Sequence, residues 1–184
     1  MIRKLLITII LSLASCSLLH SQDTFSIWGN LGLGLVKHQF DESKGGIAGS
    51  YGITARYAGY TLRYRLIDNS DFSLFSPAHE LISRELLFGY AIHLTEEPRL
   101  FDLHLGMYAG IGSAEEVTPH YVSSNGPFDD VYTTVSRFST CLPLEICFEF
   151  RIKYYIGISH TLYASYSRFT PVYGYYFSIM IGYW

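Results

Sequence analysis

The feature that most constrains this chain is an alternation of apolar with polar or small residues that recurs along its length. The longest run extends from Phe138 to Ile152 and is apolar at almost every second position. Similar runs cover about 60–66 and 101–112, and weaker ones cover 26–37, 47–57, 84–94, 155–167 and 174–184. Successive side chains of a strand point to opposite faces. The sequence therefore predicts eight β-strands, each with one apolar and one polar face.

The gaps between the runs alternate in length. Long gaps at 38–46, 67–83 and 113–137 alternate with short gaps at 58–59, 95–100 and 153–154, and a medium gap follows at 168–173. In an antiparallel barrel, this order places all the short connections at one end. Such asymmetry, with an even number of strands of about ten residues, is typical of bacterial outer-membrane proteins. The predicted fold is all-β: an eight-stranded antiparallel up-and-down transmembrane barrel with short periplasmic turns and longer extracellular loops.

Composition favours an outward-facing apolar set. Charged residues make up 16% of the chain, against about 25% in an average soluble domain. The polar set is rich in Gly, Ser and Tyr and poor in Lys, whereas a solvated exterior normally carries many charges. A soluble barrel would point its apolar set inward. A soluble secreted ligand-binding barrel is therefore retained only as a third alternative.

The last run and a proline in the longest run each predict a further feature of the barrel. The last run, YYFSIMIGYW, is apolar at alternate positions from Tyr175 to Tyr183, and a closed barrel would pair it with the first strand so that no edge is exposed. Pro143 lies inside the longest run and has no backbone N–H to donate. It predicts either a bulge or a position near the outer rim, where water can reach the strand.

The N-terminus predicts export. Arg3 and Lys4 precede an apolar stretch from Leu5 to Leu13, the arrangement of a secretory signal peptide. We expect residues 1–22 to be the signal peptide and residues 23–184 to be the barrel domain. Leu13-Ala14-Ser15-Cys16 resembles the lipobox of bacterial lipoproteins, so a mature chain beginning at a lipidated Cys16 stays open as an alternative.

The net charge and the cysteine positions each exclude one feature: a nucleic-acid partner and a disulfide bond. Cleavage after residue 22 leaves 11 of the 13 basic residues and all 16 acidic residues, and this acidic balance argues against a nucleic-acid partner. Cys141 and Cys147 fall in one predicted strand, too far apart along it for a disulfide bond.

Charged residues concentrate in the polar phase, which would face the lumen. Both signs occur there, so they can pair across an interior that an eight-stranded barrel fills with its own side chains. The predicted network consists of Arg56, Arg63, Arg65, Glu85, Asp102, His104, Glu145, Glu149 and Arg151, with His93 in the same phase. We expect a polar plug rather than a transport path.

Neither a metal site nor a cofactor is predicted. His38, His79 and His120 lie on three different predicted loops, and Glu115-Glu116 and Asp129-Asp130 lack the ordered ligand pattern of a calcium loop. Loops carry function more often than scaffolds do. The candidate surface-loop contacts are the aromatic residues Phe72, Phe75, Tyr121, Phe128 and Tyr132.

The runner-up function is a lipid A-modifying hydrolase of the outer membrane. One family of eight-stranded deacylases uses a His with a Ser two residues later and a carboxylate. Here that position after His160 is occupied by Leu162, and His160 falls in the apolar, lipid-facing phase. No catalytic residues and no enzyme activity are therefore expected, although Ser159, His160 and Glu145 are the positions that would test the alternative.

Across residues 25–184, strand spacing and the C-terminal aromatic residue resemble those of small outer-membrane barrels of the OmpA-transmembrane and OmpX kind, including uncharacterised barrels of Bacteroidota. The resemblance implies insertion into the outer membrane of a Gram-negative cell by the outer-membrane assembly machinery. It also implies contact with outer-membrane lipid and lipopolysaccharide. The leading function is a structural or surface-interaction role, with the long loops contacting an extracellular protein or glycan.

Overall fold

The computed structural model describes residues 25–38, 45–71, 80–95, 101–124, 130–152, 155–168 and 171–183. These residues form eight strands: β1 (Phe25–His38), β2 (Gly45–Tyr57), β3 (Tyr60–Asp71), β4 (Glu80–His93), β5 (Phe101–Ser124), β6 (Asp130–Ile152), β7 (Ile156–Ser167) and β8 (Val172–Tyr183). The predicted signal peptide at 1–22, the lipobox-like sequence ending at Cys16, His79 and Trp184 lie outside the described residues. Among the described residues, no helix has the length and hydropathy needed to cross a membrane.

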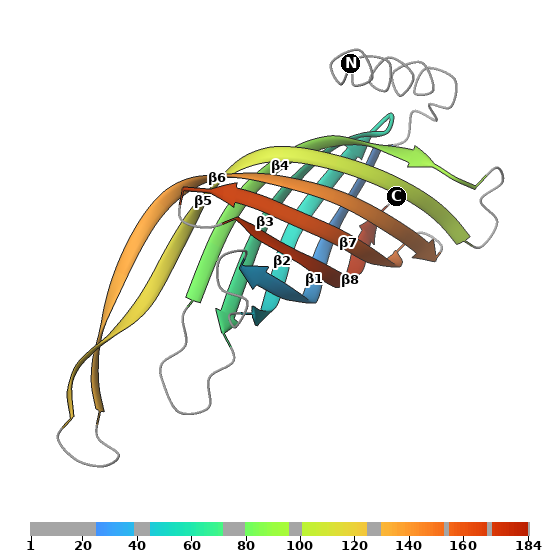
Figure 1. The fold of residues 1–184 in the computed structure, drawn as a ribbon. Coiled ribbons are helices and arrows are strands. Elements are labelled where there is room, and N and C mark those ends of the chain that lie inside the picture. The colour runs from blue at the N-terminus through green and yellow to red at the C-terminus, as the bar shows by residue number, and fades with distance from the viewer. Residues whose placement is uncertain are drawn as a thin grey trace, which may run out of the picture.

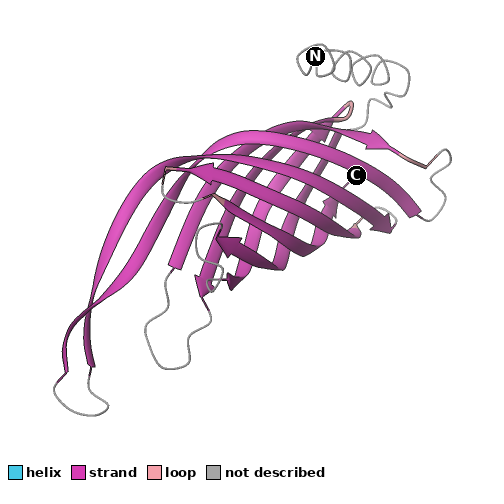
Figure 2. Cartoon of the chain, in the orientation of Figure 1, coloured by secondary structure: helices cyan, strands magenta, loops and turns pink. Residues whose placement is uncertain are grey.

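The strands form a closed antiparallel barrel in sequence order (Figures 1 and 2). Each strand pairs with the next, and β8 pairs with β1 from Ile27 opposite Tyr183 to His38 opposite Val172. The last strand therefore has hydrogen-bonded neighbours on both sides, β7 and β1. The predicted fold class and the closing role of the final strand are confirmed.

The two ends of the barrel differ, and we name them by their connections. The turn end carries the connections after β2, β4 and β6, together with the start of β1 and the end of β8. At this end Ala58 and Gly59 both have positive φ, 49° and 83°, the backbone of a tight two-residue hairpin turn. The loop end carries the connections 39–44, 72–79 and 125–129 and the link from β7 to β8.

The predicted long loop at 113–137 is wrong, because most of it is strand. β5 and β6 remain paired as far as Ser124 opposite Asp130, and Figure 1 shows this hairpin reaching well past the other strands at the loop end. β4 accompanies β5 only to Val117, and β7 meets β6 only from Cys141 onward. We call residues 118–124 and 130–140 the β5–β6 ribbon. The predicted loop at 67–83 likewise shrinks to the connection 72–79.

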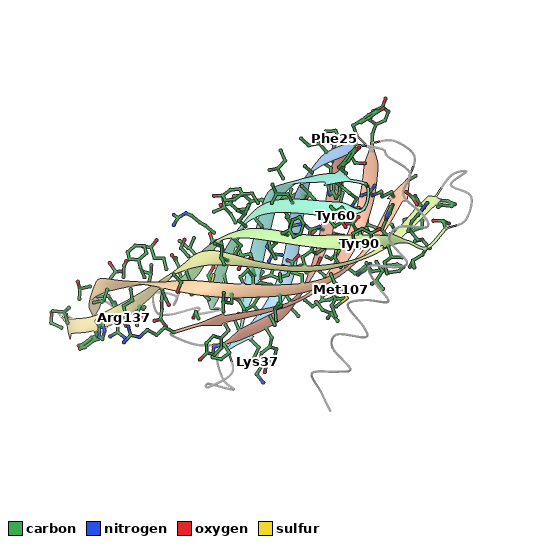
Figure 3. All side chains as sticks on the ribbon, turned by 90° about the horizontal axis from the view of Figure 1, so that it is seen from above. Phe25, Lys37, Tyr60, Tyr90, Met107 and Arg137 are labelled. Carbon is green, nitrogen blue, oxygen red and sulfur yellow. The ribbon has the colours of Figure 1, made fainter. Side chains whose placement is uncertain are left out.

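Side-chain exposure shows which face of the barrel is apolar. Leu33, Ile111 and Phe138 are each 67–69% exposed on the outside, whereas Arg63 is 5% and Glu149 0% exposed inside. Aromatic residues collect near the turn end, where the Tyr60 and Tyr90 rings meet edge to face at 5.1 Å. Figure 3 shows Phe25 near the same end and Arg137 at the opposite extreme, on the ribbon. The barrel is thus apolar outside and charged inside, as the alternation predicts.

Pro143 does not form the predicted bulge. It does lie near the rim at the loop end, because the β6–β7 pairing ends two residues away at Cys141 opposite Ser167, but its burial means that water does not reach it. It is fully buried and pairs in register with Ser165 of β7. On the β5 side, the regular pairing lapses between Ala109–Leu144 and Gly112–Cys141 without a change of register. The register shift in that ladder lies between Tyr121 and Ser123, on the ribbon. The closed barrel therefore accommodates the missing N–H by a local gap in one ladder. Cys141 and Cys147 are both buried free thiols.

Candidate functional site: the charged interior and its turn end

The centre of the interior is a set of ion pairs between β3 and β6. Arg63 and Arg65 are two residues apart on β3 and so point to the same face. The guanidinium of Arg63 donates to Oε2 of Glu145 at 2.9 Å and to Oε1 of Glu149 at 3.3 Å. It therefore bridges two carboxylates that are spaced four residues apart on β6, and this bridge joins the two halves of the network.

The half nearer the loop end is built around Glu85 of β4. Arg65 donates to Oε2 of Glu85 at 2.6 Å and also pairs with Glu145. The hydroxyl of Tyr163 donates to Oε1 of Glu85 at 2.6 Å. The guanidinium of Arg65 also lies over the Tyr163 ring, 4.9 Å from its centroid. Both oxygens of Glu85 thus have donors, as a buried carboxylate requires.

The half nearer the turn end is built around Glu149. Arg56 donates to both of its oxygens at 3.0 Å, and Arg151 donates to Oε2 at 3.1 Å. The indole of Trp28 lies beneath both cations, 5.0 Å from the Arg56 guanidinium and 4.5 Å from that of Arg151. Three arginines, counting Arg63, therefore surround one fully buried carboxylate, which makes Glu149 the most highly connected acid of the interior that the structure describes.

These contacts close the interior. Four arginines and three glutamates are at most 5% exposed. Ion pairs from β2 and β3 cross the barrel to β6, and Arg65 pairs with Glu85 on the neighbouring strand β4. A cavity of about 10 Å³ lies among Asn30, Arg63, Arg65 and Tyr176, space for about one water molecule. The arrangement is that of a polar plug cross-linked by ion pairs.

A second polar group lies at the turn end, where β4 and β5 meet. His93 is directly opposite His104 in the β4–β5 ladder, and the two imidazole rings stack with centroids 4.8 Å apart. Asp102, two residues before His104, contacts both rings: its Oδ2 is 2.7 Å from His104 Nε2, and its Oδ1 pairs with His93 Nε2. The hydroxyl of Thr95 donates to Asp102 Oδ1 at 3.2 Å. We call these four residues the His–Asp cluster.

The structure thus brings the predicted interior residues into two groups. Arg56, Arg63, Arg65, Glu85, Glu145, Glu149 and Arg151 form the network, while Asp102 and His104 belong to the His–Asp cluster. The sequence pattern did not predict Thr95 as a partner of Asp102. It also did not predict that the rings of Trp28 and Tyr163 would lie against the arginine guanidiniums. The pattern that could have located the cluster is His-x-Thr before a turn and Asp-x-His after it, since a hairpin brings such residues together.

The residues of the hydrolase alternative are not brought together. Ser159 is buried inside the barrel, next to Glu149 in the β6–β7 ladder. His160 is exposed on the outer face, where its Nδ1 contacts the Tyr175 hydroxyl. Glu145 is held by Arg63 and Arg65. A nucleophile and a base on opposite faces of one strand cannot share a proton.

Two of the predicted loop contacts are on strands instead. Tyr121 and Tyr132 are paired residues of the β5–β6 ribbon, with rings edge to face at 5.8 Å. Tyr121 is 58% exposed. Phe72, Phe75 and Phe128 lie outside the described residues.

Comparison with known proteins identifies the fold. No family model matches the chain, and no curated protein matches its sequence. Among solved structures, Neisserial surface protein A aligns with a TM-score of 0.57 and 8% identity over 86% of this chain and 97% of that one. The attachment invasion locus protein Ail of Yersinia pestis, in complex with the heparin analogue sucrose octasulfate, aligns with a TM-score of 0.51 and 14% identity over 86% of this chain and 96% of that one.

These alignments cover nearly the whole of both solved barrels, and their low sequence identity means that the fold is what is shared. The chain has the fold of the small eight-stranded outer-membrane β-barrels.

Proposed function

We propose that this protein is a non-catalytic integral outer-membrane barrel whose wall anchors it and whose β5–β6 ribbon is its interaction surface. The observation that carries the proposal is the apolar outer wall around a sealed, charged interior. Residues such as Leu35, Leu144 and Leu162 are 58–69% exposed on that wall. Leaving so much apolar surface in water costs about 25 cal/mol per Å², whereas lipid removes this cost.

The two ends fit opposite sides of the membrane. Outer-membrane barrels have short periplasmic turns and longer extracellular segments, so we assign the turn end to the periplasm and the ribbon to the cell surface. Export through the predicted signal peptide and insertion by the outer-membrane assembly machinery belong to this proposal. Outward aromatic side chains such as Tyr60 and Phe101 near the turn end suit the boundary between lipid and water.

The ribbon is the part best placed to meet a partner. Beyond Val117 and before Cys141 its two strands pair with each other but not with β4 or β7. Within its segments the sequence offers Thr and Ser hydroxyls together with Tyr121, Tyr132 and Phe138. Such a surface suits contact with an extracellular protein or an uncharged glycan. Arg137 is the one Lys or Arg in these segments, too little positive charge for a strongly anionic glycan such as the heparin analogue bound by Ail.

The topology can be tested by labelling introduced cysteines with a membrane-impermeant maleimide. Ser123→Cys on the ribbon is expected to react on intact cells, whereas Tyr155→Cys at the turn end is expected to react only after permeabilisation. The unaltered chain is the matched control, because Cys141 and Cys147 are 2% and 0% exposed and should not react. Reaction of Tyr155→Cys on intact cells, with Ser123→Cys silent, would reverse the orientation.

Fractionation tests the anchoring role independently. The protein should appear in the outer-membrane fraction, and its electrophoretic mobility should change on boiling, because a closed barrel resists detergent until it is heated. A soluble periplasmic or secreted protein without this change would instead support the ligand-binding alternative.

Two substitutions distinguish the non-catalytic barrel from the hydrolase alternative. If the barrel is not an enzyme, Ser159→Ala and His160→Gln should each leave the lipid A species of the cell unchanged when measured by mass spectrometry. Glu145 is left intact, because its pairs with Arg63 and Arg65 are structural. Loss of one lipid A species in either variant, with normal barrel formation on gels, would restore the enzyme.

A further inference from the structure

We propose that His93, Asp102 and His104 form a binding site for a divalent transition-metal ion of the zinc type at the turn end of the barrel. This site lies at the opposite end of the barrel from the ribbon, and it does not depend on the proposed function. It rests on the placement, the chemistry and the exposure of the His–Asp cluster.

The β4–β5 ladder fixes the placement. His93 is the last residue of β4 and its direct partner is His104 of β5. Asp102 lies on the same face as His104 because it is two residues away on the same strand. Side chains that stand on paired strands are held in position by the ladder, and this is the kind of rigid support that a metal site needs.

The donor atoms converge on one point. One ligand atom from each residue lies within 4.8 Å of the other two. Ligands of a tetrahedral zinc ion at about 2.0–2.1 Å are roughly 3.3 Å apart, so modest side-chain rotation would bring all three into coordination. Both imidazole Nε2 atoms face the Asp102 carboxylate. Zinc binding would replace the protons that otherwise hold these contacts together, and the released protons would pass to solvent.

The chemistry of the donors selects the class of ion. Two imidazole nitrogens and one carboxylate oxygen suit zinc and its neighbours among the transition metals, whereas Ca²⁺ and Mg²⁺ prefer oxygen ligands. Three protein ligands leave one tetrahedral position for water or another small ligand. The side chains of His93, Asp102 and His104 are 23%, 23% and 11% exposed, so an ion can reach them from the turn end.

Thr95 supplies the outer support that metal ligands usually have. Its hydroxyl donates to Asp102 Oδ1 at 3.2 Å, and its oxygen accepts from the backbone N–H of Leu103 at 2.8 Å. The first bond orients the carboxylate, and the second holds the Thr95 hydroxyl in place. Loss of such outer-shell contacts typically lowers metal affinity by 10–100-fold.

The positive charges near the His–Asp cluster are offset by a neighbouring carboxylate. Arg56 and Arg151 interact electrostatically with His104 and would oppose a bound cation. Both are paired with Glu149, at 3.0 and 3.1 Å, so their charge is partly neutralised before any ion arrives. The Asp102 carboxylate then supplies the negative charge nearest to the proposed ion.

The test measures zinc binding by the folded full-length mature barrel in detergent, produced without a histidine tag. Competition against a chromophoric zinc chelator should show one equivalent bound, with no comparable binding of Mg²⁺ or Ca²⁺. Asp102→Asn and His104→Gln should each lower zinc affinity at least tenfold, and Thr95→Val should lower it by about tenfold. Cobalt added in place of zinc should give the visible absorption of a tetrahedral nitrogen–oxygen site.

His120→Gln is the matched control, since His120 is an exposed histidine of the ribbon and should leave affinity unchanged. Heat-dependent mobility on gels shows whether each variant has folded. If His104→Gln fails to fold, His93→Gln and Thr95→Val provide the same comparison. The proposal is overturned if the unaltered barrel takes up no zinc at micromolar concentration. It is also overturned if the folded cluster variants bind zinc as tightly as the His120→Gln control.

Discussion

Replacing Glu149 by alanine is expected to destabilise the folded barrel by about 3–5 kcal/mol, the usual cost of breaking a buried ion pair from one side. Glu149 is fully buried and is contacted by Arg56, Arg63 and Arg151. Removing its charge takes the shared carboxylate from three buried guanidiniums, while Arg63 keeps its pair with Glu145 and Arg56 keeps its hydrogen bond to the hydroxyl of Tyr108. Urea titration of the barrel refolded into phospholipid vesicles measures the change in the free energy of unfolding.

Glu115→Ala is the matched control, because Glu115 is a partly exposed acid of β5 near the loop end. Exposed charges of this kind usually change stability by no more than about 0.5 kcal/mol. A double variant that also replaces Arg56 by methionine should recover part of the loss, because it removes one of the uncompensated cations. Equal stability of Glu149→Ala and Glu115→Ala would contradict the role of the network as the support of the interior.

Arginine introduced on the outer wall is expected to have the second-largest effect, and its size should depend on depth. Leu31 lies near the middle of β1 and is 67% exposed on the outside. In a bilayer, Leu31→Arg should cost about 2–4 kcal/mol, the value for a cation at the midplane of a barrel wall. The same vesicle-based urea titration gives the cost.

Ile27→Arg provides the comparison on the same strand and the same face. Ile27 is near the turn end, opposite Tyr183, where a cation can reach the lipid headgroups and should cost about 0–1 kcal/mol. If both arginines cost the same small amount, the outer wall does not face lipid. That result would favour a soluble barrel and overturn the assignment of the two faces.

The strands and their faces were predictable from sequence because each strand of the barrel proper separates two different environments. An apolar outer face and a charged interior give β6 the period of two that runs from Leu142 to Ile152. The same reasoning predicted that arginines and glutamates of the polar phase would face one another. It could not predict which would pair, because the partners of Arg63 depend on the register among β3, β4 and β6.

The ribbon was not predicted because its two faces lie in the same environment. From Tyr132 to Thr140 most side chains are exposed whichever way they point, so no alternation is imposed and the segment looks like a loop. Its Val, Tyr, Thr and Phe residues favour strands, and that preference was the one available signal.

The His–Asp cluster was missed because its members are separated by a turn. His93 and Asp102 lie on opposite sides of the turn between β4 and β5, and they meet because His93 is opposite His104 in the ladder. A shift of register by one residue would have turned Asp102 and His104 to the outer wall. The spacing of these residues therefore indicates a cluster only once the register of the β4–β5 hairpin is known.

The closure of β8 onto β1 has a consequence for how the chain could be rearranged. Ile27 and Tyr183 are direct partners in adjacent strands, and partners in an antiparallel ladder have Cα atoms about 5 Å apart. A short linker from Tyr183 to Phe25 could therefore join the end of β8 to the start of β1, and the chain could be opened between β7 and β8 at the other rim. Such a circular permutant would keep every strand neighbour while changing the order in which the strands are synthesised.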